Sequence, residues 1–182
     1  MKILKAFALA LTGIILACGQ APQQAAPDNI LVLDDFESDQ SLGRWEGPLS
    51  LSAEKVAHGA TAVRIDLSDR RNRFLASEKL PADWSGYDRL LFDIFNPSGT
   101  VELAGIQIWD GLGSDEEAEL SGQSYRGAKL YMNPGWNHFE FYLDLAMVEE
   151  GDRPLATDKI RRFRLDFGRL RGELFLDNLR LV

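Results

Sequence analysis

Alternation of apolar and polar residues with a period of two is the feature that most limits what this chain can fold into. It recurs in ten short segments, over residues 30–36, 49–53, 62–67, 74–80, 89–96, 102–109, 128–132, 137–143, 160–167 and 172–182. Glycine, proline, asparagine and aspartate separate these segments, as they separate strands. Only residues 144–150 and 156–159 have the composition of helical turns. The pattern predicts an all-β fold, an antiparallel sandwich of two sheets.

The same alternation assigns two faces to each strand, because successive side chains of a strand point to opposite sides of its sheet. In four segments one face is apolar and the other is polar or aromatic. The second set includes Arg64, Asp66, Asp93, Gln107, Trp109, Arg162, Arg164 and Asp166. If these four strands are neighbours in one sheet, one side of that sheet carries a tryptophan, an amide, carboxylates and guanidiniums together.

Such a surface suits a sugar. The C–H face of a pyranose packs on an aromatic ring, while its hydroxyls accept hydrogen bonds from Arg or Gln and donate them to Asp. The expected ligand-binding residues are Arg64, Asp93, Gln107, Trp109, Arg164 and Asp166, with Tyr125 and Arg126 as a wall after a long polar loop. The alternative is an ordinary solvated face on which Arg and Asp pair across strands.

The N-terminal segment predicts export. Lys2 and Lys5 precede an apolar run over residues 6–17, which is shorter than the ~20 residues of a membrane-spanning helix. Residues 15–18, Ile-Leu-Ala-Cys, resemble the lipobox of bacterial lipoproteins, in which the signal is cut before the cysteine and the cysteine is acylated. We therefore expect a signal peptide over 1–17 and lipidation of Cys18. A plain secretory signal that happens to precede a cysteine is the alternative.

Residues 18–29 read as the lipidated cysteine and a flexible tether rich in Gln, Ala and Pro, so the folded domain is expected over 30–182. By resemblance to Gram-negative lipoproteins, Gly19 after the cysteine favours the outer membrane. Removal of Lys2 and Lys5 with the signal leaves 18 basic residues against 28 acidic ones, a net charge of −10. The basic residues do not cluster, so this acidic chain is not expected to bind nucleic acid.

Four short motifs carry a resemblance to a known group of domains. They are LDDFE at 33–37, WSGYDRL at 84–90 before FDIFNP at 92–97, NPGWN at 133–137 and LDNLRL at 176–181. Together they resemble the galactose-binding-like jelly rolls of carbohydrate-binding modules. This resemblance spans nearly all of residues 30–182 and implies two packed sheets without a catalytic centre. Similar domains also occur in proteins that assist the assembly of respiratory complexes, so the fold alone does not determine the function.

The resemblance also implies one structural calcium ion, which many such modules hold between their first and last strands. The residues that match in kind are Asp35, Glu37 and Asp177, whose carboxylates are hard oxygen ligands, and Gly59, which could add a backbone carbonyl. The first and last strands would then have to lie side by side. Acids at strand ends and turns without any metal are the alternative.

Little in the sequence favours catalysis. The chain has two histidines, His58 and His138, without metalloprotease or nucleophile-elbow spacing around them, and both are expected to be structural. No pair of carboxylates stands out as a glycosidase pair. Trp45, Trp84 and Trp136 lie beside turns, where packing is the expected role.

The sequence therefore predicts a lipid-anchored β-sandwich that binds carbohydrate on one sheet face or its adjoining loops, without chemistry of its own. A structural or assembly lipoprotein whose sandwich docks a protein partner is the alternative function.

Overall fold

The computed structural model describes residues 29–112, 125–149 and 153–182. The predicted signal sequence and Cys18 lie outside the described residues, as does the predicted tether except for its last residue. None of the helices in the described residues is long and apolar enough to cross a membrane.

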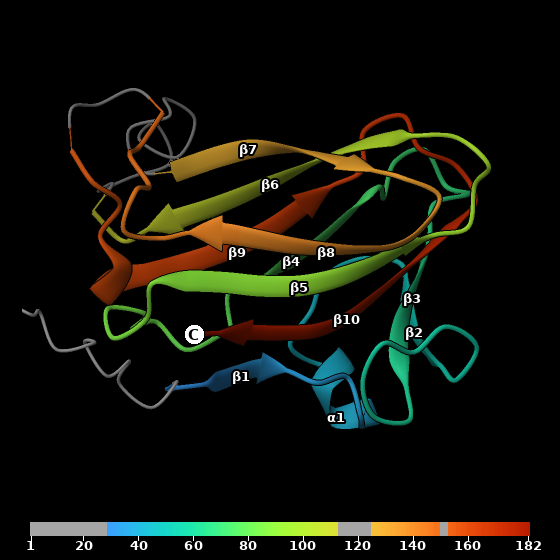
Figure 1. Cartoon of the computed structure of the whole chain (residues 1–182), viewed down its shortest axis with the longest axis horizontal. Coiled ribbons are helices and arrows are strands. Elements are labelled where there is room, and N and C mark those ends of the chain that lie inside the picture. The colour runs from blue at the N-terminus through green and yellow to red at the C-terminus, as the bar shows by residue number, and fades with distance from the viewer. Residues whose placement is uncertain (1–28, 113–124, 150–152) are drawn as a thin grey trace, which may run out of the picture.

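The described residues form two antiparallel sheets packed face to face (Figure 1), which confirms the predicted all-β sandwich. Sheet A contains β1 (Leu31–Asp34), β2 (Leu49–Ser52), β3 (Ala62–Asp66), β5 (Arg89–Asn96), β8 (Gly135–Tyr142) and β10 (Glu173–Leu181). Its order is β2-β3-β10-β5-β8, and β1 also pairs with β10. Sheet B contains β4 (Phe74–Ser77), β6 (Glu102–Asp110), β7 (Tyr125–Met132) and β9 (Ile160–Asp166), in the order β4-β9-β6-β7.

Each strand overlaps a predicted segment. The structure differs from the prediction informatively at two places, the start of β7 and the predicted helical turn at residues 144–150. β7 begins at Tyr125 instead of residue 128, because its first residues pair with the far end of β6, where Tyr125 lies opposite Trp109. The predicted helical turn at 144–150 is wrong for its described part, which is not helical. These residues follow a single turn in which the Ala146 amide donates a 3.1 Å hydrogen bond to the Leu143 carbonyl.

Two short helical elements complete the described fold. The turn η1 (Thr157–Lys159) confirms the one predicted at 156–159. The helix α1 (Asp39–Leu42) was not predicted, since four residues are too few to show helical periodicity.

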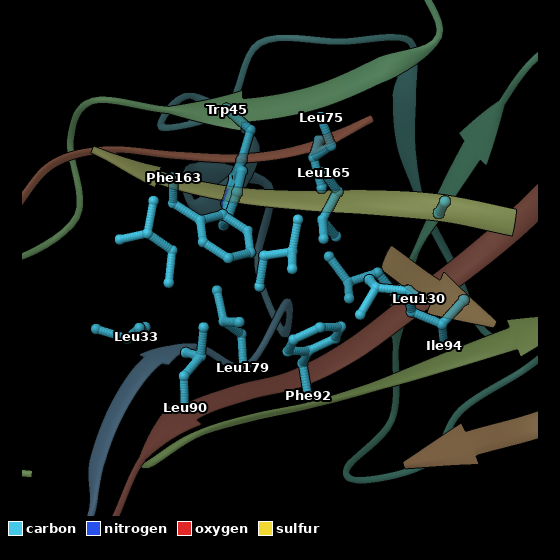
Figure 2. Close-up of a cluster of buried hydrophobic side chains, with 14 of the residues drawn as sticks. Leu33, Trp45, Leu75, Leu90, Phe92, Ile94, Leu130, Phe163, Leu165 and Leu179 are labelled. Atoms are coloured by element: carbon cyan, nitrogen blue, oxygen red, sulfur yellow. The ribbon is translucent and has the colours of Figure 1, made fainter. Parts of the chain in front are cut away.

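A continuous apolar core fills the space between the sheets (Figure 2). Phe92 of sheet A meets Phe163 of sheet B edge to face, with ring centroids 6.4 Å apart. Trp45 packs against the other side of Phe163 at 6.0 Å, and Trp84 is fully buried, so both tryptophans have the predicted packing role. The alternation assigned the core side of β3, β5, β6 and β9 correctly, because all their predicted inward residues are buried.

The first and last strands lie side by side, as the resemblance implied. Leu31 lies opposite Leu181, and a bulge in β1 follows Val32. At the end of β1 the buried carboxylate of Asp34 accepts hydrogen bonds from the Phe36 amide at 2.9 Å and the Trp45 indole at 2.7 Å. This carboxylate holds the chain where it leaves the sheet, with Phe36 at a φ of 55°.

Candidate functional site

The predicted ligand-binding residues do not share one sheet. Arg64 lies on β3 and Asp93 on β5, both in sheet A, whereas Gln107, Trp109, Arg164 and Asp166 lie on β6 and β9 in sheet B. The expectation of a single surface is therefore wrong for Arg64 and Asp93. Both point away from the core, but they lie on the outer face of sheet A, on the opposite side of the sandwich from the four residues of sheet B. Period-two alternation reports which face a residue occupies and carries no information about which sheet its strand joins.

The outer face of sheet B, called surface B below, is built from cross-strand rows of side chains. In the first row Tyr125 of β7, Trp109 of β6 and Arg162 of β9 lie side by side. The following rows contain Gly127, Gln107 and Arg164, then Lys129, Gly105, Asp166 and Phe74, and finally Tyr131 and Leu103. Four of the predicted residues thus lie on this face together with Tyr125, which was predicted as a wall.

Trp109 lies between an aromatic ring and a guanidinium. Its ring centroid is 5.3 Å from that of Tyr125, with the two planes tilted by 37°. The Arg162 guanidinium lies 5.8 Å from the Trp109 ring on the other side, within reach of a cation–π interaction. These neighbours fix the orientation of a half-buried indole on the outside of the sheet, so the aromatic platform exists before any ligand arrives.

A depression of about 360 Å³ lies beside this platform. Its lining includes Gln107 of β6, Tyr125 and Lys129 of β7, Asp166 of β9, and Glu149 from the segment after β8. Gly105 and Gly127 also line it, and the missing side chains leave the backbone uncovered. At the other end of surface B the cross-strand pair Leu103 and Tyr131 is exposed to 46% and 65%. The depression therefore lies between two apolar ends.

Three charged side chains of surface B are held by their neighbours. The Arg164 guanidinium donates to Asp166 Oδ2 at 2.8 Å and lies over the Phe74 ring at 4.6 Å. Arg162 is near the carboxylates of Glu78 at 3.4 Å and Glu46 at 3.8 Å. The buried Nε atoms of Arg162 and Arg164 have no hydrogen-bond partner. Donors and acceptors therefore alternate across the face without a strong excess of either charge.

Arg126 does not lie on surface B. It is opposite Ile108 in the β6–β7 register, so its side chain starts on the core side of the sheet. At the edge of the sheet it lies 3.6 Å from Glu149, whose Oε1 also accepts a 2.9 Å hydrogen bond from the Gly127 amide. Arg126 thus contributes to the edge beside the depression through Glu149.

Seven members of surface B were absent from the predicted set: Phe74, Leu103, Gly105, Gly127, Lys129, Tyr131 and Arg162. The alternation in β9 already places Arg162 on the same face as Arg164. Gly127 and Lys129 are on the same face of β7 as Tyr125, and a predicted strand that began at Tyr125 would have included them. Phe74 and Gly105 carry no signal of their own, because only the strand order brings them beside Asp166.

The predicted calcium ligands converge in part. Glu37 Oε1 accepts hydrogen bonds from the amides of Ala60 at 2.8 Å and Thr61 at 3.2 Å. It lies so close to Gly59 that a Cβ at this position would clash with it. Asp177 Oδ2 accepts from the amides of the adjacent residues Ala57 and His58, both at 2.8 Å. Both carboxylates therefore bind the loop at residues 57–61.

One atom of this group fits a cation well. Asp177 Oδ1 is buried and has no hydrogen-bond partner. Burial raises the pKa of Asp177 and the nearby charge of Asp93 raises it further, while hydrogen bonds from the amides of His58, Ala57 and Asn178 oppose the shift. Asp35 differs, since it is exposed and its Oδ1 accepts only from the Glu37 amide, 3.3 Å. Within the described residues no three acidic, histidine or cysteine side chains are grouped to hold a metal. Of the predicted calcium ligands, Glu37 and Asp177 are the two whose carboxylates contact the loop at residues 57–61.

Comparison with known proteins identifies the fold. No protein-family model matches the sequence, and no curated protein sequence matches it. Among solved structures, the family 11 carbohydrate-binding module from Clostridium thermocellum in complex with a beta-1,3-1,4-mixed-linked tetrasaccharide superposes with a TM-score of 0.58 at 16% identity, over 84% of this chain and 95% of that one. The fold is that of a carbohydrate-binding module jelly roll.

Two further structures support the same assignment. Module CBM27-1 from Caldicellulosiruptor saccharolyticus, solved in complex with mannohexaose, matches with a TM-score of 0.52 at 16% identity, over 84% of this chain and 96% of that one. An exo-beta-agarase matches with a TM-score of 0.60 at 16% identity over 83% of this chain, which corresponds to only 24% of the agarase. The same fold thus occurs both as a separate module and as part of a larger enzyme.

Proposed function

We propose that this protein is a non-catalytic carbohydrate-binding protein that holds a glycan on surface B. The observation that carries the proposal is the Trp109 and Tyr125 pair at the edge of a depression whose floor lacks side chains at Gly105 and Gly127. The likeness in fold to modules solved with oligosaccharides supports it.

Each part of surface B has a role in this proposal. The Trp109 indole packs against the C–H face of a sugar ring, which removes apolar surface from water. Gln107, Lys129 and Arg164 donate hydrogen bonds to hydroxyl oxygens, and Asp166 accepts from hydroxyl groups. Because Arg164 and Asp166 are already held by each other, little side-chain entropy of this pair is lost when a ligand binds.

The length of surface B favours an extended chain over a single sugar. Tyr125 and Tyr131 lie six residues apart on the same face of β7, which is about 20 Å at the rise of a β-strand. Tyr131 is one of the most exposed aromatic residues of the described fold, and Leu103 lies beside it. A glycan of several rings that crosses the depression reaches both aromatic ends.

A direct test measures binding of the mixed-linked tetrasaccharide and of mannohexaose by calorimetry, with Trp109→Ala compared with Tyr142→Ala. Tyr142 is a matched control, an exposed aromatic residue on β8 of sheet A. We expect Trp109→Ala to weaken binding at least about tenfold, since the change removes the aromatic platform, worth about 1–3 kcal/mol. Tyr142→Ala should leave the affinity unchanged.

Two results would contradict the proposal. One is an affinity that is the same in Trp109→Ala as in the unchanged protein. The other is the absence of sugar binding across a wide glycan array, combined with capture of a membrane protein that free oligosaccharide does not displace. That second result would favour the docking function.

We infer further that the chain is anchored to the outer membrane through acylated Cys18, as the lipobox resemblance implies. A tether of Gln, Ala and Pro residues would then separate the sandwich from the bilayer. We also infer that Glu37 and Asp177 bind one calcium ion. When bound, the ion would supply positive charge to the buried Asp177 and join the 57–61 loop to the first and last strands.

A further inference from the structure

A second depression, of about 400 Å³, lies on the outer face of sheet A, on the opposite side of the sandwich from surface B. Its lining residues come from β5, β8, β10 and the loop after β2, and include Leu91, Asp93, His138, Phe139, Asn178 and Arg180. His58 and Glu140 also line it, so both histidines of the chain are here. No residue that lines this depression belongs to surface B.

Asp93 is the fixed centre of this depression. It is 7% exposed, although it lies on the outer face of its strand. Its Oδ1 is 2.5 Å from Nδ1 of His138, and its Oδ2 accepts a 2.9 Å hydrogen bond from the Asn178 amide nitrogen. A carboxylate offers about four acceptor positions, so two remain for a ligand after these contacts. Asp93 is therefore a positioned acceptor.

His138 and Arg180 place a second acceptor and several donors around Asp93. When Nδ1 of His138 carries the proton that Asp93 accepts, Nε2 is left as an acceptor on the opposite side of a ring that is 76% exposed. Arg180 donates one long hydrogen bond of 3.3 Å to the Asn178 carbonyl. It makes no ion pair within the described part of the chain, so most of its five N–H donors remain available.

The surroundings of these groups are apolar on one side and carry charges of both signs. Leu91 and Phe139 line the depression. Trp136 does not line it but lies on the same outer face of β8 as His138, packed edge to face on Phe95 at 5.4 Å. Glu140 is paired with Arg89 at 2.7 Å, and Arg180 lines the same depression as Asp93. The arrangement suits an uncharged ligand with an apolar side and neighbouring hydroxyls.

We propose that this depression is a second, separate binding site for a neutral sugar. One hydroxyl of the sugar donates to Asp93, its neighbour accepts from Arg180 and donates to Nε2 of His138, and the C–H side packs towards Leu91 and Phe139. The site accommodates a terminal or single ring, whereas surface B holds an extended chain. The protein can thus bind a glycan on each side of the sandwich, which raises its avidity for a surface that displays many chains.

The two histidines supply a specific reporter, because the only imidazole signals in the spectrum come from this depression. The experiment follows the His Cε1–H signals by NMR in the full-length protein held in detergent, while methyl β-glucoside, methyl β-galactoside and methyl α-mannoside are added in turn. We expect at least one sugar to shift the signal of His138 saturably. The same shift is expected in Trp109→Ala, since that change affects only surface B.

Two variants test the polar contacts. Arg180→Ala and Asp93→Asn should weaken the sugar-dependent shift about tenfold or more, because each removes a hydrogen bond to a charged group. Arg64→Ala is the matched control, since Arg64 lies on the outer face of the same sheet, is paired with Glu173 at 2.6 Å and does not line the depression. It should leave the titration unchanged, and melting curves verify that every variant is folded.

The outcomes separate this proposal from the proposed function. Sugar binding by calorimetry that Trp109→Ala abolishes, with histidine signals that never move, would overturn the second site and leave surface B intact. Shifts that persist equally in Arg180→Ala and Asp93→Asn would also overturn it. Saturable shifts that Arg64→Ala preserves and the two site variants lose would support it, even if surface B bound nothing.

Discussion

At the scale of single residues, glycines matter on surface B because of the side chains they lack. Gly105 and Gly127 lie diagonally across β6 and β7, and together they leave the strands uncovered between the two aromatic ends. Gly105 needs no special backbone conformation, and a Cβ there would meet nothing closer than 3.8 Å. Gly105 therefore contributes to the shape of the depression, and a substitution there can test the effect on binding separately from the effect on stability.

We expect Gly105→Leu to abolish or strongly weaken glycan binding while the protein stays as stable as before or becomes slightly more stable. The larger side chain fills the depression, and replacing glycine within a strand favours folding by up to about 1 kcal/mol. Calorimetry with the mixed-linked tetrasaccharide and urea unfolding measure the two effects. Gly105→Ala is the control and should still bind. Full binding by Gly105→Leu would show that the ligand lies elsewhere.

At the scale of elements, one buried ion pair fixes the end of β6 next to Trp109. Asp110 is inaccessible to solvent, and Arg153 contacts it twice, at 2.6 and 3.0 Å. The amides of Ala156 and Leu112 donate to it as well, at 2.9 and 3.2 Å. These contacts join the last residue of β6 to the segment that leads into β9. Asp110 therefore holds two neighbouring strands of sheet B at the end that carries the aromatic platform.

The ionisation of Asp110 predicts how stability depends on pH. Burial alone would raise the pKa of Asp110, but the hydrogen bonds from Arg153, Ala156 and Leu112 outweigh it and lower the pKa. A carboxylate with a lowered pKa stabilises the fold above its unfolded pKa of about 3.9, and this contribution is lost as the pH falls through the lower folded value.

We expect Asp110→Asn to reduce the free energy of unfolding at pH 7 by about 2–3 kcal/mol, the magnitude for hydrogen bonds to a buried charge. The difference between the two proteins should begin to shrink as the pH falls below about 4, where the carboxyl of the unfolded chain takes up a proton, and it should be lost below the lowered pKa of the folded carboxyl. Urea unfolding at both pH values measures it. A difference that stays constant across this range would mean that the charge of Asp110 contributes nothing.

The loop at residues 57–61 provides a second prediction at the element scale. If calcium binds Glu37 and Asp177, adding Ca²⁺ to chelator-treated protein should raise the melting temperature in proportion to the logarithm of the ion concentration at saturation. Asp177→Asn should remove this dependence, and Asp35→Asn should preserve it, since Asp35 does not contact the loop. An identical melting temperature with chelator and with Ca²⁺ would argue for ordinary turn carboxylates.

At the scale of the whole molecule, the acidic charge and the proposed anchor determine where the two faces can act. A sandwich with binding residues on both outer faces needs access from two sides, and a flexible tether permits this at a membrane surface. The charge of −10 expected after processing keeps the domain from adhering to anionic lipids.

We therefore expect the wild-type chain to sediment with membranes when expressed in a Gram-negative bacterium, and Cys18→Ala to appear in the soluble fraction. Acyl chains bind the bilayer with about 0.8 kcal/mol per buried CH₂, so two or three chains give a durable anchor. The soluble variant should keep the melting temperature of the folded domain. Membrane association that persists in Cys18→Ala, or a mass without acyl chains, would contradict the lipid anchor.

The sequence by itself determined the fold class and the orientation of most side chains. Inward residues such as Val63, Phe92, Ile106 and Phe163 could be predicted because burial of alternate side chains leaves a period of two in any one strand. The adjacency of the first and last strands could be predicted only through the family resemblance. Cys18 was predicted from a short local motif, and its lipidation stays a prediction.

Only the tertiary structure decided which of these faces meet. Strand order depends on contacts between segments far apart in the chain, which leave no local pattern in the sequence. For this reason the neighbours of Trp109, which are Tyr125, Arg162 and Gly127, could not be predicted from alternation alone. Asp93 lies in the other sheet, where its neighbours are His138, Asn178 and Arg180. The polar residues that alternation placed on one face therefore form two surfaces on opposite sides of the sandwich. The reason is that the sequence of a strand determines which of its side chains share a face, whereas the sheet to which it belongs depends on the strands with which it pairs.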